Sequence, residues 1–397
     1  MSPILRLMKK YIILISAIFI QICLGVGYSW STFVPALKQT CNLTITQTQT
    51  IFGTGSLIIT LCIFAGGRIV DRLGPKIPAL FGGIIFGCSY IAAGFSSGAY
   101  SSLLVLIGVC AATGVGLCYL CPIVCVVKWF PKHKSLVTGI VVSGYGGSPI
   151  IVSLLGEYLL SRQVHVLDIF QYLGIAFLFI VPVASLFLQN PSKENETQPV
   201  HDINITNLVK DRNFLGLLCG IFPGLCIGLM TIGNIKPFGL SLHLNAIITG
   251  TAVSILAFFN ATGRITWGVI GGILEGRKTI LLSLISTCLT CFFAAFAVGN
   301  NSTFFLFVVL AGFNYGACLV LYVAEVAHHY GTEKMGTIYS TLFLCNGIAG
   351  FTAPPLAGRI FDRTGSYAPA FLIFGCLAFL SILFFFHLYQ PEKRKFS

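Results

Sequence analysis

The residue that points most directly to chemistry is Arg264, in the stretch AFFNATGRITWGVIGG at 257–272. The apolar run around it, 246–270, is long enough to cross the hydrocarbon core of a bilayer, which is about 30 Å thick. A charge at the bilayer centre costs about 2.5–3.5 kcal/mol on insertion scales, and arginine cannot lose its proton to escape that cost. We therefore expect Arg264 to face a cavity, a carboxylate or a bound anion. A structural pair with another helix, or snorkelling to the surface, is the alternative.

Five aromatic residues also fall in the middle of apolar runs rather than at their ends, where aromatic belts are found. They are Tyr28, Trp30, Tyr119, Tyr315 and Tyr322. Tyr315 and Tyr322 are seven residues apart, so they share one face of a helix. Tyrosine hydroxyls could orient a carboxylate while the rings exclude water, although simple packing explains such residues equally well.

Proton coupling would need a titratable group inside the membrane. Glu325 falls within an apolar run, and His328 follows it at a spacing that brings both side chains together on a helix. Such a pair could titrate near neutral pH. An acid near a helix end is also suited to anchoring a loop arginine as a gate, which is the alternative role for Glu325. Glu157 lies near the end of another run.

The elements that must position these residues are membrane-spanning helices. The chain of 397 residues is 56% hydrophobic and only 9% charged, whereas soluble domains carry about 25% charged residues. Apolar runs of about 20 residues recur along it. The predicted spans are 11–33, 48–68, 77–96, 102–126, 136–158, 167–188, 213–235, 246–270, 279–298, 302–326, 335–357 and 367–388.

The net charge of +12 follows the positive-inside rule rather than indicating a nucleic-acid partner. Most lysines and arginines fall in the segments that lie on the side of the N-terminus. The predicted loops of the other side hold Lys38, Arg162, Lys236, Arg359 and Arg363. This asymmetry predicts a multi-pass protein of the cell or inner membrane with both termini in the cytoplasm.

A polar stretch divides the helices into two sets of six. It predicts an N-terminal six-helix bundle at 1–188, a cytoplasmic linker at 189–212 and a C-terminal six-helix bundle at 213–397. GGRIVDRLGPK at 66–76 and GGILEGRK at 271–278 follow the second helix of each set, which is typical of the internal repeats of transporters. The pattern residues of these loops are Gly67, Asp71, Arg72, Gly74 and Lys76 in the first copy and Arg277 and Lys278 in the second.

The first loop pattern, G-x-x-x-D-R-x-G-x-K, resembles the loop signature of the major facilitator superfamily. Further stretches resemble the oxalate–formate antiporter group and its monocarboxylate-transporting relatives: GVGYSWSTFVPAL (25–37), GVGLCYLCP (114–122), KWFPKHKSLVTGIVVSGYGG (128–147), GRITWG (263–268) and HHYGTEKMGTIYS (328–340). The resemblance implies an all-α fold of twelve transmembrane helices in two pseudo-symmetric six-helix bundles. It also implies that Arg264 binds the substrate carboxylate and that aromatic residues of the first and tenth helices wall the site.

One departure from that group concerns the charge of the site. Where oxalate-handling members place a lysine in the eleventh helix, this chain has Asn346, within FLCNGIAG (343–350). Two close negative charges in a low dielectric require two positive partners, so one cation favours a monocarboxylate such as lactate, pyruvate or formate. An interhelical hydrogen bond is the structural alternative for Asn346. Dicarboxylate antiport of the oxalate–formate type remains the alternative function.

Other classes of function find less support in the sequence. The CxxC pairs Cys118/Cys121 and Cys288/Cys291 lie in apolar runs, where cysteine behaves as a small hydrophobe. No metal site, cofactor or catalytic cluster is visible, so the sequence favours a monomeric carrier in the lipid bilayer over an enzyme. A non-transporting nutrient sensor on the same scaffold would be expected to carry long cytoplasmic extensions. Proton symport and anion exchange stay open.

Overall fold

The computed structural model describes residues 3–131, 134–191, 208–274, 276–331 and 335–390, and the secondary structure of these residues is helical. The first half contains α1 (Pro3–Leu24), η1 (Gly25–Ser29), α2 (Trp30–Thr40), α3 (Ile45–Leu73), α4 (Lys76–Gly94), α5 (Tyr100–Leu103), η2 (Leu104–Ala111), α6 (Ala112–Trp129), α7 (Lys134–Ser161) and α8 (Val166–Ser185). The second half contains α10 (Arg212–Ser241), α11 (Ala246–Ile273), α12 (Gly276–Phe296), α13 (Asn301–Tyr330), α14 (Met335–Thr364) and α15 (Ala368–Leu388).

These elements correspond to the predicted spans. Eleven continuous helical stretches are long and apolar enough to cross a membrane; one combines α1, η1 and α2, and another combines α5, η2 and α6. The remaining span, α14, is less apolar and packs between α3 and α10. The first span is broken at its centre by the 3₁₀ segment η1, which has glycine at positions 25 and 27. The all-α, polytopic fold expected from the sequence is therefore confirmed.

Several helices extend beyond their predicted ends, because hydropathy marks the lipid-covered part of a helix and not its full length. The largest consequence concerns Lys236, which we expected in a loop. It lies inside α10, which continues to Ser241, and its side chain is only 5% exposed. Arg359 and Arg363 were also expected in a loop, but they lie in the last turns of α14.

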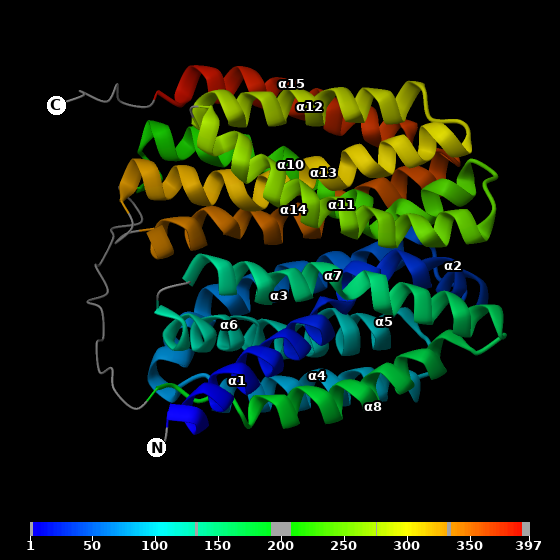
Figure 1. The fold of residues 1–397 in the computed structure, drawn as a ribbon. Helices are drawn as coiled ribbons and strands as arrows, with labels where there is room; N and C mark the ends of the chain where they lie inside the picture. The colour runs from blue at the N-terminus through cyan, green and yellow to red at the C-terminus, as the bar shows by residue number, and fades with distance from the viewer. Residues whose placement is uncertain (1–2, 132–133, 192–207, 275, 332–334, 391–397) are drawn as a thin grey trace.

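The helices form two groups, with α1–α8 in the lower half of the view and α10–α15 in the upper half (Figure 1). We call these groups the N-bundle and the C-bundle. Contacts between them join α3 to α14, α7 to α11 and α2 to α10. At the α3–α14 contact the backbones touch, because a Cβ added to Gly53 would lie 2.4 Å from the carbonyl oxygen of Gly350. Glycine is thus required for this approach.

The side on which α1 begins and α15 ends is called the terminal face, and the other side the opposite face (Figure 1). The bundles meet tightly near the opposite face. There the Asp362 carboxylate of α14 accepts hydrogen bonds from the amides of Ile45 (3.2 Å) and Thr46 (2.8 Å), at the start of α3. This carboxylate satisfies amides that have no partner within their own helix.

An ion pair links the two bundles at another place in the same interface. The Lys236 ammonium donates to Glu157 Oε1 of α7 at 2.5 Å and to the carbonyl oxygen of Thr32 in α2 at 3.2 Å. Both contacts therefore bind the two bundles to each other near the opposite face.

Candidate functional site

Arg264 lies on α11 at the interface between the bundles. Its Nε donates to the side-chain oxygen of Asn260, one turn earlier on the same helix, at 3.2 Å. Its guanidinium reaches α7 of the N-bundle, because a Cβ added to Gly146 would lie 3.7 Å from Nη2. The cation is half-buried and lies between the two bundles. Transporters built from two repeats bind their substrate at this kind of interface.

The surrounding helices pack closely enough to fix the position of Arg264. A Cβ added to Gly263 would lie 2.4 Å from the carbonyl oxygen of Phe313, and one added to Gly316 would lie 2.6 Å from the Arg264 amide nitrogen. The backbones of α11 and α13 therefore touch at this level. Small residues allow such an approach, and the approach holds the arginine on a rigid element.

The partner of Arg264 is neutral. Arg264 Nε donates to the amide oxygen of Asn260, whereas Glu157 is paired with Lys236. An amide orients the guanidinium without cancelling its charge. The remaining N–H groups form a planar fork that matches a carboxylate.

Five tyrosines lie near this charge, and we call them the tyrosine cage. The hydroxyls of four of them are within electrostatic range of the Arg264 guanidinium: Tyr119 of α6, Tyr145 of α7, Tyr315 of α13 and Tyr339 of α14. The fifth, Tyr28 of η1, has its hydroxyl 3.2 Å from that of Tyr315, so a hydrogen bond joins the two bundles.

The rings of the cage contact one another within the N-bundle. The Tyr28 and Tyr145 centroids are 5.1 Å apart, and the Tyr119 and Tyr145 centroids are 5.3 Å apart, both edge to face. This arrangement depends on η1, because a Cβ added to Gly25 would lie 2.1 Å from the Tyr145 carbonyl oxygen. Only glycine lets α7 come close enough for its tyrosine to meet Tyr28.

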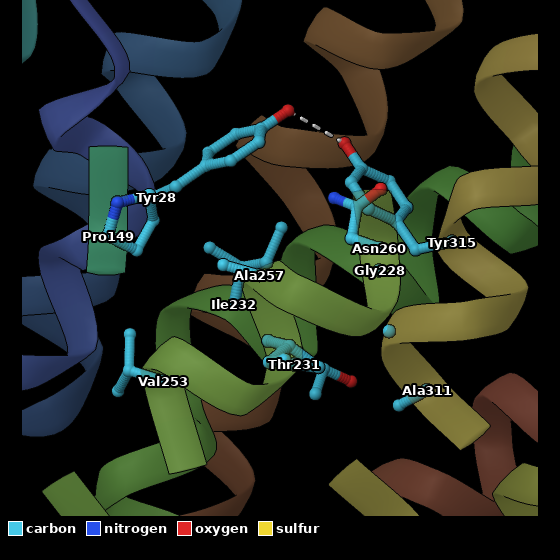
Figure 2. A pocket seen from close by; sticks show the side chains of 12 residues that line it. Tyr28, Pro149, Gly228, Thr231, Ile232, Val253, Ala257, Asn260, Ala311 and Tyr315 are labelled. Atoms are coloured by element: carbon cyan, nitrogen blue, oxygen red, sulfur yellow. Dashed lines mark hydrogen bonds between the residues drawn. The ribbon is translucent and has the colours of Figure 1, made fainter. Parts of the chain in front are cut away.

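A small pocket lies beside the Tyr28–Tyr315 bond, and both bundles line it (Figure 2). Pro149 comes from α7, whereas Thr231 and Asn260 come from α10 and α11. Asn260 thus borders the pocket and also holds Arg264.

Sequence reasoning missed Tyr145 and Tyr339. Tyr145 stands between glycines in SGYGG (143–147), and this was a usable signal, since glycines on both sides indicate close approach of another helix. Tyr339 carries no such signal.

Two predicted site residues lie away from Arg264. The Trp30 indole donates to the carbonyl oxygen of Thr48 at 3.0 Å and stacks on Phe170, inside the N-bundle. Tyr322 is 1% exposed and lies against Gly220 of α10, inside the C-bundle. Both residues pack within a single bundle.

Asn346 contacts the other bundle, but through a hydrogen bond of its own. Its Nδ2 donates to the Thr60 hydroxyl of α3 at 3.1 Å. The interhelical bond that we considered for this residue is thus present, and the amide joins α14 to α3.

Glu325 and His328 do not form a pair. The Glu325 carboxylate is buried and accepts a hydrogen bond from the hydroxyl of Tyr389, at the end of α15. Burial, and then this bond, raise the pKa of Tyr389. His328 is exposed, whereas His329 bonds to Asn213 of α10 at 3.1 Å. Glu325 therefore joins α13 to α15 near the terminal face.

The loop pattern is described in part. Gly74 ends α3 with a φ of 72°, Arg72 is exposed and Lys76 begins α4; the side chain of Asp71 and the surroundings of Gly67 lie outside the described residues. In the second copy, Arg277 donates to the carbonyl oxygen of Phe386 at 2.7 Å and joins α12 to α15, and Lys278 is exposed.

The family model and the related proteins agree on one family. The sequence matches the family model described as Major Facilitator Superfamily over residues 15–354 and 225–397. It is 25% identical to the oxalate:formate antiporter of Oxalobacter formigenes, over 90% of this chain and 86% of that one. It is 26% identical to YhjX, an uncharacterized MFS-type transporter of Escherichia coli strain K12, over 85% of both chains. It is 24% identical to human monocarboxylate transporter 12, over 88% of this chain and 74% of that one.

Solved structures show the same fold. A bacterial homolog of the human lysosomal transporter Spinster, in an inward-facing and unoccupied conformation, superposes with a TM-score of 0.76 at 15% identity, over 98% of both chains. The same homolog in its occupied inward-facing conformation gives a TM-score of 0.73 at 14% identity, over 95% of this chain and 96% of that one. From its family match and its apolar helices, this chain is an integral multi-pass membrane protein that belongs to the Major Facilitator Superfamily.

Proposed function

We propose that this protein is a secondary active transporter of a small organic monocarboxylate, and that Arg264 binds the carboxylate. The observation that carries the proposal is a half-buried guanidinium, placed between the bundles, whose hydrogen-bond partner is a neutral amide. A cation in this position needs an anion to offset the cost of its burial. A substrate carboxylate supplies that anion and leaves again with the substrate.

The charge of the site favours one carboxylate over two. The position on α14 where oxalate-handling members of the resembling group have a lysine carries Asn346, whose amide bonds to the Thr60 hydroxyl. An amide does not compensate a second negative charge in a low dielectric. The names of the relatives include an oxalate:formate antiporter and a monocarboxylate transporter, and the neutral Asn346 favours the monocarboxylate.

The tyrosine cage would complete the site. Hydroxyls of both bundles lie near the guanidinium, and those of Tyr28 and Tyr315 are hydrogen-bonded to each other. A carboxylate oxygen could take the place of one hydroxyl partner at little cost in hydrogen bonds. Binding would then draw the two bundles together.

Transport would follow from rocking of the bundles about this site. The contacts of Asp362 and Lys236 hold the bundles together at the opposite face. The bias of lysine and arginine toward the terminal face supports a cytoplasmic location for that face. The structure would thus represent the state that is closed to the outside.

Purified protein in liposomes tests the proposal. We expect uptake of labelled lactate, pyruvate or formate to exceed that of oxalate, and Arg264→Gln to lower uptake about 100-fold or more, because a bidentate pair loses two charged hydrogen bonds of about 1.5–3 kcal/mol each. Arg162→Gln, which removes an exposed arginine at the end of α7, is the matched control. Normal uptake by Arg264→Gln would disprove the anion site.

The same liposomes separate proton symport from anion exchange. A symporter accumulates substrate when only a pH gradient is imposed. An exchanger requires a second organic anion inside the vesicle and ignores that gradient.

A further inference from the structure

A second cavity lies inside the N-bundle, next to the tyrosine cage. Its volume is about 70 Å³, and its walls come from the first span, α3, α4, η2, α6 and α7. Tyr28 and Tyr145 line it, and both also belong to the cage around Arg264. The two rings are therefore common to the tyrosine cage and to this cavity.

The lining of the cavity is suited to hydrocarbon. It includes Leu24, Ile51, Phe52, Phe86, Ile107 and Val115, and none of the residues that line it is charged. The indole N–H of Trp30, which also lines it, is already bonded to the carbonyl oxygen of Thr48. A carboxylate would find no cation there, whereas an alkyl group would leave water for an apolar wall.

The backbone around the cavity has an unusual feature. The segment η2, Leu104–Ala111, is a π-helix of eight residues, and its Ile107 and Ala111 form part of the wall. The π-helix is rare and is frequently found at functional sites. Its wider turn places this wall differently from that of a continuous α-helix.

Open space in the cavity begins next to the cage. A Cβ added to Gly27, the residue before Tyr28, would meet no atom within 4 Å. One added to Gly55 of α3 would make ordinary contact, at 3.8 Å from the Ala112 Cβ. At both positions the missing side chain leaves room in the cavity.

We propose that this cavity receives the hydrocarbon part of the substrate while Arg264 holds its carboxylate, so that the protein selects short-chain aliphatic monocarboxylates over formate and oxalate. The inference rests on the proposed function. An engineered apolar cavity of about 150 Å³ holds benzene, with its six carbons, so about half that volume accommodates a group of about three carbons. The substrate is then an acid of about four carbons.

A series of straight-chain acids, from formate to hexanoate, tests this assignment in liposomes. Each methylene that enters the cavity should lower KM about fourfold, because burying it contributes about 0.8 kcal/mol. The decrease should stop at about four carbons, when the cavity is full. In Gly27→Val the chain length that gives the lowest KM should become shorter by one or two carbons, and the KM of butyrate should rise more than that of formate.

The matched control is Gly139→Val, at an exposed glycine of α7 where an added Cβ also meets nothing within 4 Å. It should leave the chain-length profile unchanged. Gly55→Ala provides a second, smaller filling of the cavity and should shift the profile in the same direction as Gly27→Val. A purely structural defect would lower the uptake of every acid by the same factor.

The outcomes distinguish the two proposals. Two results overturn the cavity assignment and leave the carboxylate site in place. One is uptake that depends on Arg264 but shows no chain-length preference. The other is a Gly27→Val protein in which KM changes by the same factor for every acid, so that the preferred chain length is unchanged. Uptake of no carboxylate, or uptake that is indifferent to Arg264→Gln, overturns both.

Discussion

At the scale of single residues, Asn260 decides how much charge Arg264 offers to a ligand. Its amide oxygen accepts from Nε at 3.2 Å and leaves the charge intact. A carboxylate in the same place would form an internal ion pair and compete with the substrate. The neutrality of this residue is therefore as important to the proposed site as the cation itself.

Asn260→Asp tests this point. At neutral pH the introduced carboxylate should pair with Arg264 and raise the KM for monocarboxylates about tenfold, since a hydrogen bond to a charged group contributes about 1.5–3 kcal/mol. The increase in KM should persist from pH 5 to pH 8, because pairing with Arg264 favours the charged form of the introduced carboxyl and keeps it ionised over this range. The measurement is initial uptake from pH 5 to pH 8.

Asn260→Ala is the control for this substitution. It removes the hydrogen bond without adding charge and should raise KM only a few-fold, independently of pH. Equal effects of the two substitutions at every pH would contradict the assigned role of Asn260.

At the scale of helices, the ion pair between buried Lys236 and half-buried Glu157 holds α7 against α10. Removing one partner leaves the other buried and uncompensated, at a cost of about 3–5 kcal/mol to the closed state. Glu157→Gln should therefore shift the protein toward opening at the opposite face. We expect faster hydrogen exchange in residues 30–40 and 230–241, followed by mass spectrometry.

The exchanged pair, Glu157→Lys with Lys236→Glu, controls for a general loss of stability. It restores opposite charges and should return hydrogen exchange toward that of the unmodified protein. If Glu157→Gln leaves exchange at the opposite face unchanged, the ion pair does not contribute to closure.

The bond between Glu325 and Tyr389 is the second contact at this scale. It joins α13 to α15, which supports an anchoring role over proton coupling. Glu325→Gln and Tyr389→Phe should each lower the melting temperature, since each weakens a buried charged hydrogen bond, and should leave the pH dependence of uptake unchanged. Loss of pH-driven uptake in Glu325→Gln alone would instead assign the proton to this carboxylate.

At the scale of the whole molecule, the periodicity and length of the apolar runs are enough to predict the helices. The depth of Arg264 follows from its place in such a run. The direction in which a side chain points around its helix cannot be predicted in this way, because it depends on which neighbouring helix packs against it. Trp30 and Tyr322 therefore turned into their own bundles, whereas Tyr145 faces Arg264 from a helix on which we had predicted no aromatic site residue.

Lys236 illustrates the same difficulty for charges. Hydropathy places a lysine near the end of an apolar run in the adjoining loop, and only the packing of α2, α7 and α10 shows that its ammonium is buried between bundles. Pairs that form between distant helices are tertiary contacts, and a single sequence carries no record of them.

The contact between Gly53 and Gly350 has a mechanical consequence. Gly53 is eight residues from the start of α3 and twenty from its end, so the two arms of the helix measure about 12 Å and about 30 Å. A rotation of the bundles about this fulcrum moves the long arm about two and a half times as far as the short one. A narrow parting at the opposite face therefore corresponds to a wide swing at the terminal face, and the two mouths of the carrier would differ in width.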